Sequence, residues 1–394
     1  MGTYRRQPVT FVRGEGVYLY DDEGAKYLDF VGGIAVTAIG HAHPAVADAL
    51  ATQASKLVHV SNLYYTEPMA MLAQRLCDLL GWPDGKVFFC NSGAEANECA
   101  IKLVRRWGRD NFGPHRFVTI AALGSFHGRT LETLAATGQP KKWEPFMPLP
   151  PGFVHVPFDD ADAIAAAIDE NTCSVLLEPV QGEGGIVVPS AEYLPEVRKI
   201  CDEREVAFIA DEVQTGLGRT GQWFAWQSSG ASPDVVTIAK ALGNGLPIGA
   251  CVARGPFADA LGPGDHATTM GGGPAVCAAA LAVLDVIETE DLVGNASRTG
   301  VYLRDGLDAL CEQHGSISEV RGAGLLLALQ MDSDVAGEAV NEARLRGLLV
   351  NDVSPSALRL SPALTVTREQ CDHALAILDE VISGIERSAP KGER

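Results

Sequence analysis

The sequence lacks the features that mark several classes of protein. Its nine cysteines include no CxxC pair and form no cluster with histidine at the spacing of a zinc site. This predicts reduced cysteines in a hydrophobic core, with neither a disulfide framework nor a metal site. No apolar run approaches the length of a membrane-spanning helix, and the initial MGTYRRQPVT contains no apolar signal segment. We therefore expect a cytoplasmic protein that does not bind membranes.

Positive charge is scarce as well. The 394 residues include 31 lysines and arginines against 50 aspartates and glutamates, which gives a net charge of −19. That charge disfavours binding to nucleic acids and to anionic membranes, because their phosphates would repel it. Hydrophobic residues form 46% of the chain, enough for a large core divided between two domains of one subunit.

The stretch from Val206 to Lys240 contains two apolar runs of strand length, VAFIA and PDVVTIA. The first run leads into Asp211 and the second into Lys240. Short β-branched runs bounded by Pro and Gly predict buried strands of a parallel sheet. Because ligands of such sheets bind at the carboxyl ends of the strands, we expect Asp211 and Lys240 to meet in one crevice.

A carboxylate and an amine in one crevice suit pyridoxal 5'-phosphate. This cofactor needs a lysine for a Schiff base with its aldehyde and an acid that keeps its ring nitrogen protonated. The alternative is structural: Asp211 would cap a turn or helix, and Lys240 would be a solvated residue at a strand end.

A second strand, loop and helix pattern is present in KVFFCNSGAEANECAIK. The small residues Ser92, Gly93 and Ala94 stand where the helix begins, so backbone N–H groups beside the positive helix end could hold a phosphate. An ordinary serine cap followed by a glycine turn would explain the same pattern.

Two further apolar segments end in polar loops. RFVTIAALG leads into SFHGRT, where Phe126 could cover an aromatic ring and Arg129 could bind a carboxylate in a bidentate way. Alternatively, Phe126 is a core residue and Arg129 a solvated residue at a helix start. CSVLLEPVQGEGG follows, with Glu178 and Glu183 near glycines that let the chain pass close to a ligand.

Two histidines in GGIAVTAIGHAHP have three interpretations. His41 and His43 could be metal ligands, ligand-facing turn residues, or residues that fix the loop before Pro44. Since the sequence offers no third metal ligand nearby, we favour the loop role.

Six motifs in order carry a resemblance to a known family: SGAEANECAIK, FHGRT, EPVQGEGG, ADEVQTGLGRTG, TIAKALGNGLPIGA and HATTMGGGPAVCAAA. In these motifs the chain resembles the class III, fold type I pyridoxal-phosphate aminotransferases, and within that class it is most similar to the acetylornithine aminotransferases. The likeness extends from LDFVGGIAV near the start to LRLSPAL near the end.

The resemblance implies an α/β fold. A large domain, with a mostly parallel central sheet flanked by helices, would be joined to a smaller α/β domain. We expect the large cofactor-binding domain at residues 61–275, with residues 1–60 and 276–394 forming the small domain. We expect the tail after Ser388 to be disordered.

The resemblance also implies a set of cofactor contacts. Lys240 would bind the aldehyde covalently, Asp211 would pair with the ring nitrogen, and Gln214 would lie near the phenolic oxygen. A threonine from a partner subunit would complete the phosphate site, so a homodimer with a shared active site is expected. The full predicted set is Ser92, Gly93, Ala94, Phe126, Asp211, Val213, Gln214, Lys240 and, across the interface, Thr269.

Four residues match positions that contact substrate in the family: Arg129, Thr268, Glu183 and Arg359. Arg129 would take the carboxylate of an acylated amino acid, and Glu183 would mask Arg359 until 2-oxoglutarate binds. The implied reaction transfers the terminal amino group of N2-acetylornithine to 2-oxoglutarate, with catalytic roles for Lys240 and Asp211. It would yield N-acetylglutamate 5-semialdehyde and glutamate in arginine biosynthesis.

Departures from the family pattern bear on the choice of substrate. They lie at Thr37, Met270 and Gly273, near the pocket or the interface. Residues 33–35 lack the tyrosine of free-ornithine aminotransferases, which favours an acylated donor. Ornithine, succinylornithine, succinyl-diaminopimelate and 4-aminobutyrate stay open as donors, and a non-transaminating pyridoxal-phosphate protein of the same fold is the remaining alternative.

Overall fold

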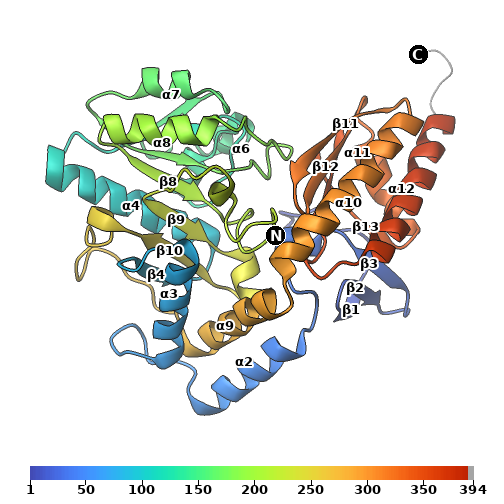
Figure 1. The fold of residues 1–394 in the computed structure, drawn as a ribbon, viewed down its shortest axis with the longest axis horizontal. Helices are drawn as coiled ribbons and strands as arrows, with labels where there is room; N and C mark the ends of the chain where they lie inside the picture. The colour runs from blue at the N-terminus through green and yellow to red at the C-terminus, as the bar shows by residue number, and fades with distance from the viewer. Residues whose placement is uncertain (389–394) are drawn as a thin grey trace.

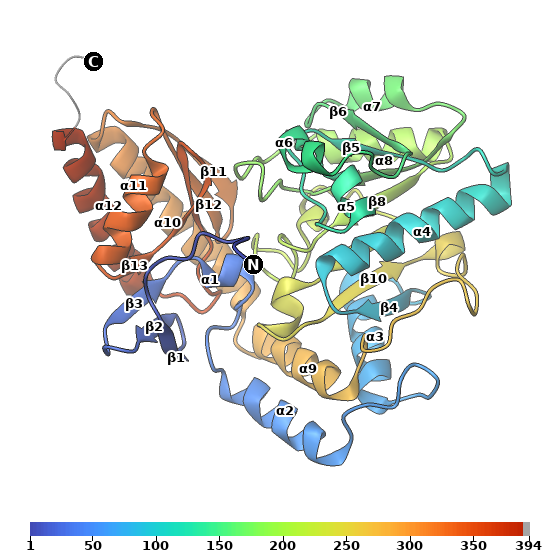
Figure 2. The same ribbon diagram turned by 180° about the vertical axis from the view of Figure 1, so that it is seen from behind.

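The computed structural model describes residues 1–388, and the tail predicted to be disordered lies outside them. Two bodies of the chain lie side by side (Figures 1 and 2). The larger contains a seven-stranded sheet, and the smaller contains two four-stranded sheets. This mixed α/β architecture is the predicted fold.

The large sheet has the strand order β4-β10-β9-β8-β7-β5-β6. Neighbours from β9 to β6 pair in parallel, whereas β10 runs antiparallel to both β4 and β9. The strands are β4 (Lys86–Cys90), β5 (Val118–Ala122), β6 (Phe153–Val156), β7 (Thr172–Leu177), β8 (Ala207–Asp211), β9 (Val235–Ile238) and β10 (Gly249–Ala253).

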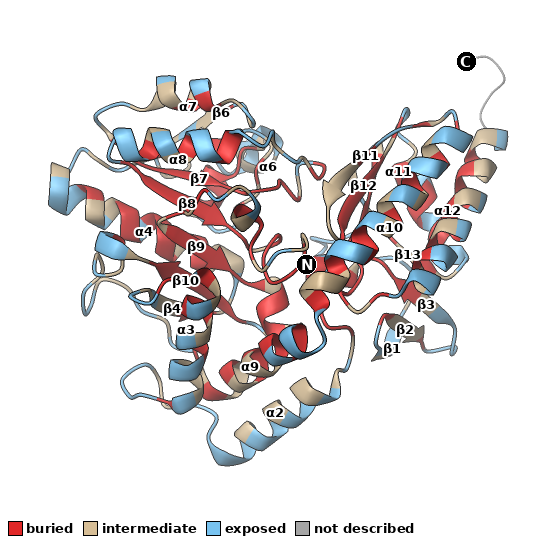
Figure 3. Ribbon diagram, in the orientation of Figure 1, coloured by how far each residue is buried: buried red, intermediate tan, exposed pale blue. Residues whose placement is uncertain are grey.

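Helices cover both faces of this sheet because successive side chains of each strand point to opposite faces. In β8, Phe208 packs with the helix α8, while the next residue, Ile209, packs with α4 on the other face. The central strands are therefore apolar at nearly every position and buried throughout (Figure 3). The helices of this body are α3 (Glu67–Leu80), α4 (Gly93–Phe112), α5 (Leu131–Ala136), α6 (Pro140–Trp143), α7 (Ala161–Ala167) and α8 (Tyr193–Glu203).

The smaller body contains most of the chain after residue 290 and the first strands of the protein. Its helices are α10 (Leu292–Gln313), α11 (Ala336–Leu345) and α12 (Arg368–Ser388). One sheet has the order β11-β12-β15-β14, built from β11 (Ile317–Ala323), β12 (Leu326–Met331), β14 (Asn351–Ser354) and β15 (Ala357–Leu360). The other is an N-terminal meander, β1 (Phe11–Glu15), β2 (Tyr18–Asp21) and β3 (Lys26–Asp29), with β13 (Leu348–Leu349) beside β3.

Three further helices adjoin these elements. The short α1 (Gly32–Ala35) follows the meander, and α2 (Pro44–Lys56) packs on α9 (Pro274–Thr289), as Figures 1 and 2 show. No residue of α2 is buried. The predicted domain boundary at residue 60 lies after α2, and the one at residue 275 lies in the first turn of α9. Both boundaries stay predictions.

The two histidines near the start of α2 hold loops in place. His43 Nδ1 accepts a hydrogen bond from the backbone N–H of Ala45 at 3.3 Å, and His41 Nε2 lies 2.7 Å from Asp29 Oδ2. Within residues 1–388, no group of three or more His, Cys, Asp or Glu side chains is arranged to hold a metal ion. The loop role is therefore the one that the contacts support.

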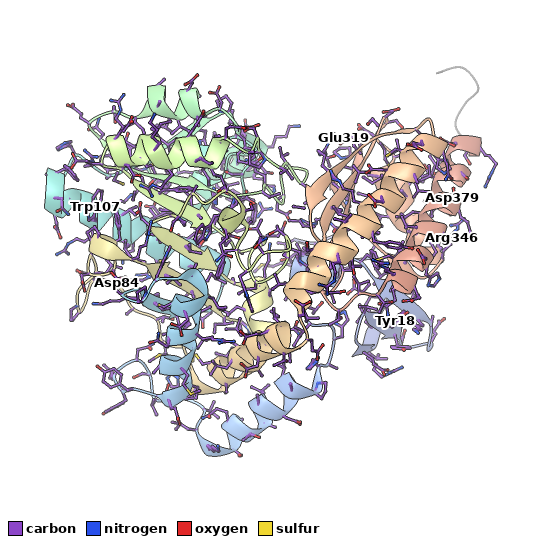
Figure 4. The ribbon with its side chains drawn as sticks, viewed as in Figure 1. Tyr18, Asp84, Trp107, Glu319, Arg346 and Asp379 are labelled. Carbon is purple, nitrogen blue, oxygen red and sulfur yellow. The ribbon has the colours of Figure 1, made fainter. Side chains whose placement is uncertain are left out.

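All nine cysteines are free, and eight of them are buried. This agrees with the prediction of reduced core cysteines. Of the helices in residues 1–388, none combines the length and the apolar content needed to cross a membrane. Charged side chains such as Asp84, Glu319 and Arg346 are exposed on the surface (Figure 4).

Candidate active site

A cavity of about 380 Å³ lies beside the carboxyl ends of the central strands. Asp211 closes β8, and Lys240 follows the end of the neighbouring parallel strand β9 by two residues. The cavity lining includes ten of the predicted site residues: Ser92, Gly93, Ala94, Phe126, Arg129, Glu183, Asp211, Val213, Gln214 and Lys240. Thr268, Thr269 and Arg359 lie outside the lining.

Asp211 is 3% exposed, and three polar groups surround its carboxylate. Asn97 Nδ2 donates to Oδ2 at 2.8 Å, His127 Nδ1 lies 2.8 Å from the same oxygen, and the N–H of Val213 donates to Oδ1 at 3.1 Å. Asn97 is itself fixed, because its Oδ1 accepts from Thr237 Oγ1 at 2.8 Å. These contacts replace the lost hydration of the carboxylate and set its direction.

Lys240 has a backbone φ of +44°, in the left-handed region that side chains other than glycine rarely adopt. It begins a short 3₁₀ turn that ends at Asn244, whose side chain accepts from the N–H of Ile39 and donates to the carbonyl of Gly40. Burial lowers the pKa of Lys240 to about 8, although the negative charge of Glu183 opposes that shift. Near neutral pH the amine therefore has an appreciable uncharged fraction that can act as a nucleophile or base.

Ser92 caps the 20-residue helix α4, since its Oγ accepts from the N–H of Glu95 at 3.2 Å. Gly93 and Ala94 form the start of the first turn, where backbone N–H groups have no partner within a helix. A Cβ on Gly93 would lie 2.7 Å from a methyl carbon of Val213, so this contact requires glycine. The structural role of Ser92 and an anion site are compatible, because capping leaves the remaining N–H groups at the cavity.

Glu178 joins two loops of the cavity. Its Oε1 accepts from the N–H of Phe126 at 2.8 Å, and its Oε2 accepts from the N–H of Gly182 at 3.0 Å. Burial raises the pKa of Glu178 to about 7, opposed by the nearby His127. The loop that carries Phe126 and the loop that carries Glu183 are thus held in one arrangement.

Arg359 comes from β15 of the smaller body and reaches the larger one. Its Nη1 lies 2.5 Å from Glu183 Oε1 and 3.4 Å from Gln214 Oε1, and the residue is 1% exposed. Burial by itself would raise the pKa of Glu183, but the charge of Arg359 holds that pKa below its usual value. The pair that the resemblance implies is therefore formed in this structure, across the two bodies.

The other predicted substrate residues lie at the edge of the cavity. Arg129 is exposed there, and Thr268 Oγ1 lies 3.4 Å from Nδ2 of the lining residue Asn91. Thr269 is exposed and does not line the cavity of its own chain. Its role in the site of a second subunit stays a prediction.

A family model described as aminotransferase class-III matches residues 2–382. This chain belongs to the class-III aminotransferases. The family predicted from the motifs is confirmed, and the match covers both bodies of the structure.

Individual relatives of this class-III aminotransferase share nearly its full length. The acetylornithine aminotransferase of Caldanaerobacter subterraneus is 48% identical over 98% of this chain and 97% of its own. That of Streptomyces coelicolor is 50% identical over 99% and 94%. Among solved structures, the ornithine aminotransferase of Toxoplasma gondii, with pyridoxal phosphate partly occupying its active site, aligns with a TM-score of 0.94 at 32% identity, over 98% and 92% of the two chains.

Class-III aminotransferases use pyridoxal 5'-phosphate, and the cavity of this one fits that cofactor. Its donor set offers a carboxylate for the ring nitrogen, an amine for the aldehyde and a helix N-terminus for the phosphate. In addition, Nε2 of the buried Gln214 has no hydrogen-bonding partner within residues 1–388. A phenolic oxygen would supply the acceptor that this group lacks.

From the sequence of the aminotransferase no role was predicted for Asn97 or His127, although the side chains of both contact the Asp211 carboxylate. The sequence does contain a hint of the position of each residue. Asn97 follows Gly93 by about one helical turn and so faces the same side, and His127 directly follows Phe126 in the FHGRT motif. The contacts to Asp211 depend on strands and a helix that are far apart in the chain, so the sequence order alone does not show them.

The lowered pKa of Lys240 can be measured in the aminotransferase without cofactor. We expect one lysine to titrate near pH 8, because burial favours its neutral form, so that it is mostly charged below that pH and mostly neutral above it. The measurement is NMR titration after 13C-methylation of the lysines. The signal missing from the Lys240→Met variant identifies the residue, and a midpoint near 10.5, the ordinary value, would contradict the prediction.

Proposed function

We propose that this enzyme transfers the terminal amino group of N2-acetylornithine to 2-oxoglutarate. The products would be N-acetylglutamate 5-semialdehyde and glutamate, a step of arginine biosynthesis. The proposal is supported by the names of the curated relatives. Eight relatives that are 45–50% identical over 97–99% of this chain are acetylornithine aminotransferases.

The residues around the cavity have distinct tasks in this reaction. Bound pyridoxal phosphate supplies an electron sink next to the reacting carbon. Asp211, fixed by Asn97 and His127, holds a proton at the ring nitrogen. Lys240, with its lowered pKa, takes a proton from the carbon that bears the amine. It then gives the proton to the second reacting carbon. Phe126 covers the ring and excludes water.

Glu183 and Arg359 give one pocket two specificities. The donor brings an uncharged carbon chain to the reacting end, whereas 2-oxoglutarate brings a carboxylate to the same place. A free Arg359 would attract the wrong end of the donor, so its pairing with Glu183 favours the terminal amine. When Glu183 turns away, Arg359 can bind the α-carboxylate of the keto acid.

In this proposal Arg129 takes the α-carboxylate of the donor. It lines the cavity edge and has no carboxylate partner within residues 1–388. Thr268 lies next to the lining residue Asn91, and we assign it a contact with the acyl group. Residues 33–35, which precede the lining residue Val36, include no tyrosine. Free-ornithine aminotransferases have a tyrosine in this segment, so its absence favours an acylated donor.

We further propose a cytoplasmic homodimer with a shared active site. A large apolar surface is exposed beside the segment of Thr269, and exposed patches of this kind mark interfaces. Asn62 Nδ2 donates to the carbonyl oxygens of Thr268 and Gly271, which joins that segment to the apolar one. The exposed side chains are Leu57, Val58, Leu63, Tyr64, Tyr65, Met71 and Met270.

The donor can be identified from the absorbance of the holoenzyme. We expect the cofactor band to convert to the aminated form fastest with N2-acetylornithine, compared with succinylornithine, ornithine and 4-aminobutyrate, in the absence of keto acid. Addition of 2-oxoglutarate should restore the band, because the two half-reactions use the site in turn. Faster conversion with another donor would replace the proposed substrate and leave the transaminase assignment intact.

Removing the mask on Arg359 should change the choice between donors. Glu183→Ala leaves the arginine permanently free, so the preference for N2-acetylornithine over glutamate in the first half-reaction should fall by about tenfold or more. Rapid-mixing absorbance gives both rates. Glu312→Ala, an exposed glutamate on α10, is the matched control. If Glu183→Ala leaves the ratio of the rates with N2-acetylornithine and glutamate unchanged, Glu183 does not control the access of donors to Arg359.

The dimer predicts a solution mass about twice the 41.7 kDa of one chain. Thr269→Ala should weaken retention of pyridoxal phosphate by about tenfold, since it removes one hydrogen bond to a charged group. Sedimentation and dialysis of the holoenzyme measure the two quantities. A monomeric protein, or a dimer whose Thr269→Ala variant retains cofactor as well as the parent, would refute the shared site.

A further inference from the structure

The loop after β7 carries Glu183 and contacts the smaller body beside the ion pair with Arg359. Arg321 of β11 donates to the carbonyl oxygen of Gly185 from Nη2 at 2.9 Å and from Nε at 3.2 Å. β11 and β12 lie on the side of the smaller body that faces the larger one (Figures 1 and 2). The loop is therefore joined to the smaller body by its backbone as well as by the carboxylate of Glu183.

Arg321 and Arg359 lie in one row of side chains. Arg321 pairs with Ala328 across β11 and β12, and Ala328 pairs with Arg359 across β12 and β15. Residues directly opposite each other on neighbouring strands point to the same face of a sheet. One face of this sheet thus presents two guanidiniums to the loop, with a small apolar residue between them.

The apolar part of the loop packs on the middle of this row. Two loop residues and two residues of β12 form a buried cluster: Val180, Ile186, Leu326 and Ala328. Ile186 has a backbone φ of +55°, a left-handed conformation that a β-branched residue rarely adopts. A residue is held in such a conformation only where its surroundings determine it, and the cluster and the bond to Gly185 are those surroundings.

Glu183 itself is flanked by glycines, which give the loop little stiffness of its own. Before it in the chain, the N–H of Gly182 donates to Glu178 Oε2 at 3.0 Å. After it, the carbonyl oxygen of Gly185 accepts from Arg321. The direction of the Glu183 side chain therefore depends on two anchors, one in each body.

Neighbours in the smaller sheet orient Arg321. Its Nη2 also donates to Gln330 Oε1 at 3.0 Å, and Gln330 Nε2 donates to the hydroxyl of Ser356 at 2.9 Å. Its Nη1 donates to Glu319 Oε2 at 2.9 Å, but the Glu319 side chain is 55% exposed, as Figure 4 shows, and a surface pair of this kind contributes little to stability. The guanidinium is thus directed at Gly185 mainly by Gln330.

We propose that Arg321 is a positioning residue that holds Glu183 against Arg359 and thereby sets the donor preference of the pocket. Because both arginines lie on one sheet face, a shift of the smaller body moves them together, and the loop stays in register with its ion pair. Without Arg321, the glycines would let the loop change its path, and Glu183 would mask Arg359 less completely. The inference rests on the proposed function, since it concerns the masking that is assigned there to Glu183.

The test compares the rates of the first half-reaction with N2-acetylornithine and with glutamate in the holoenzyme, measured by rapid-mixing absorbance. Arg321→Met removes the bonds to Gly185 and keeps an unbranched stem. Arg321→Lys keeps the charge but cannot form both bonds of the planar guanidinium. Glu319→Gln is the matched control, since it removes the exposed ion pair of the same guanidinium and leaves the bonds to Gly185.

In Arg321→Met we expect the preference for N2-acetylornithine over glutamate to fall by about fivefold, because a hydrogen bond that positions Glu183 is lost. Arg321→Lys should lie between the parent and Arg321→Met, and it takes the place of Arg321→Met if that variant does not retain the cofactor band. Glu319→Gln should keep the parent ratio. The KM for 2-oxoglutarate should not rise in any of these variants, because Arg359 is unchanged.

A double variant separates positioning from a general effect on fold or charge. In the Glu183→Ala background, Arg321→Met should change the ratio by less than about twofold, because the residue that Arg321 positions is already gone. An equal fall in both backgrounds would show that Arg321 acts without Glu183 and would overturn the proposal. A parent ratio in both Arg321 variants, or an equal loss of rate with both donors, would also overturn it.

The same measurements distinguish this inference from the proposed function. If Glu183→Ala lowers the ratio and the Arg321 variants do not, only the role of Arg321 is refuted. If Glu183→Ala keeps the parent ratio, the mask is refuted and the role of Arg321 with it. If the parent enzyme does not convert N2-acetylornithine, that donor is refuted, and the ratio is measured with the ω-amino donor that the enzyme converts fastest.

Discussion

The burial of the Asp211 carboxylate is the constraint on which the site depends. A buried charge without partners would destabilise the folded protein by roughly several kcal/mol. Here Asn97 from α4, His127 from the loop after β5 and the N–H of Val213 supply those partners. Each comes from a different part of the large sheet or its helices, so the charge is tolerated only when the sheet is complete. The fold and the electrostatics of the ring-nitrogen site are therefore formed together.

The same arrangement distributes charge unevenly over an acidic protein. Lys240 and Arg129 line the cavity, and Arg359 lies outside the lining but is paired with the lining residue Glu183. The lining also contains the carboxylates of Glu178, Glu183 and Asp211, so its cations are balanced locally, whereas the whole chain has a net charge of −19. Because Arg359 belongs to the smaller body, its ion pair with Glu183 links the cavity to the position of that body.

Much of the large domain could be predicted from the sequence. The runs that end at Asp211 and Lys240 are adjacent parallel strands, and the capped helix after Ser92 begins at the cavity. These features follow from local patterns: apolar runs of strand length, glycines where the chain must pass close to another segment, and small residues at a helix start. The meander at the N-terminus was predictable for the same reason.

Other parts of the site depend on contacts between distant segments. The FHGRT motif places His127 next to Phe126 in sequence, yet its contact with Asp211 spans 84 positions. Glu178 joins the loops of Phe126 and Glu183 through backbone N–H groups, which every sequence has, so no residue pattern marks those bonds. Lys142 lies in a proline-rich excursion with no regular pattern, and only the packing of α6 brings its amine to 4.7 Å from the centre of the Phe126 ring.

The sequence by itself determined the family, the cofactor, the order of strands and loops and the residue types that carry the chemistry, because these are properties of local spacing. The tertiary structure decided which groups surround each charge. It buried Asp211 among three partners, lowered the pKa of Lys240 by removing it from water, paired Arg359 with Glu183 and left Lys142 with Arg129 beside one aromatic ring. The physical reason is that desolvation and Coulomb energies depend on distances in space, which a linear sequence does not contain.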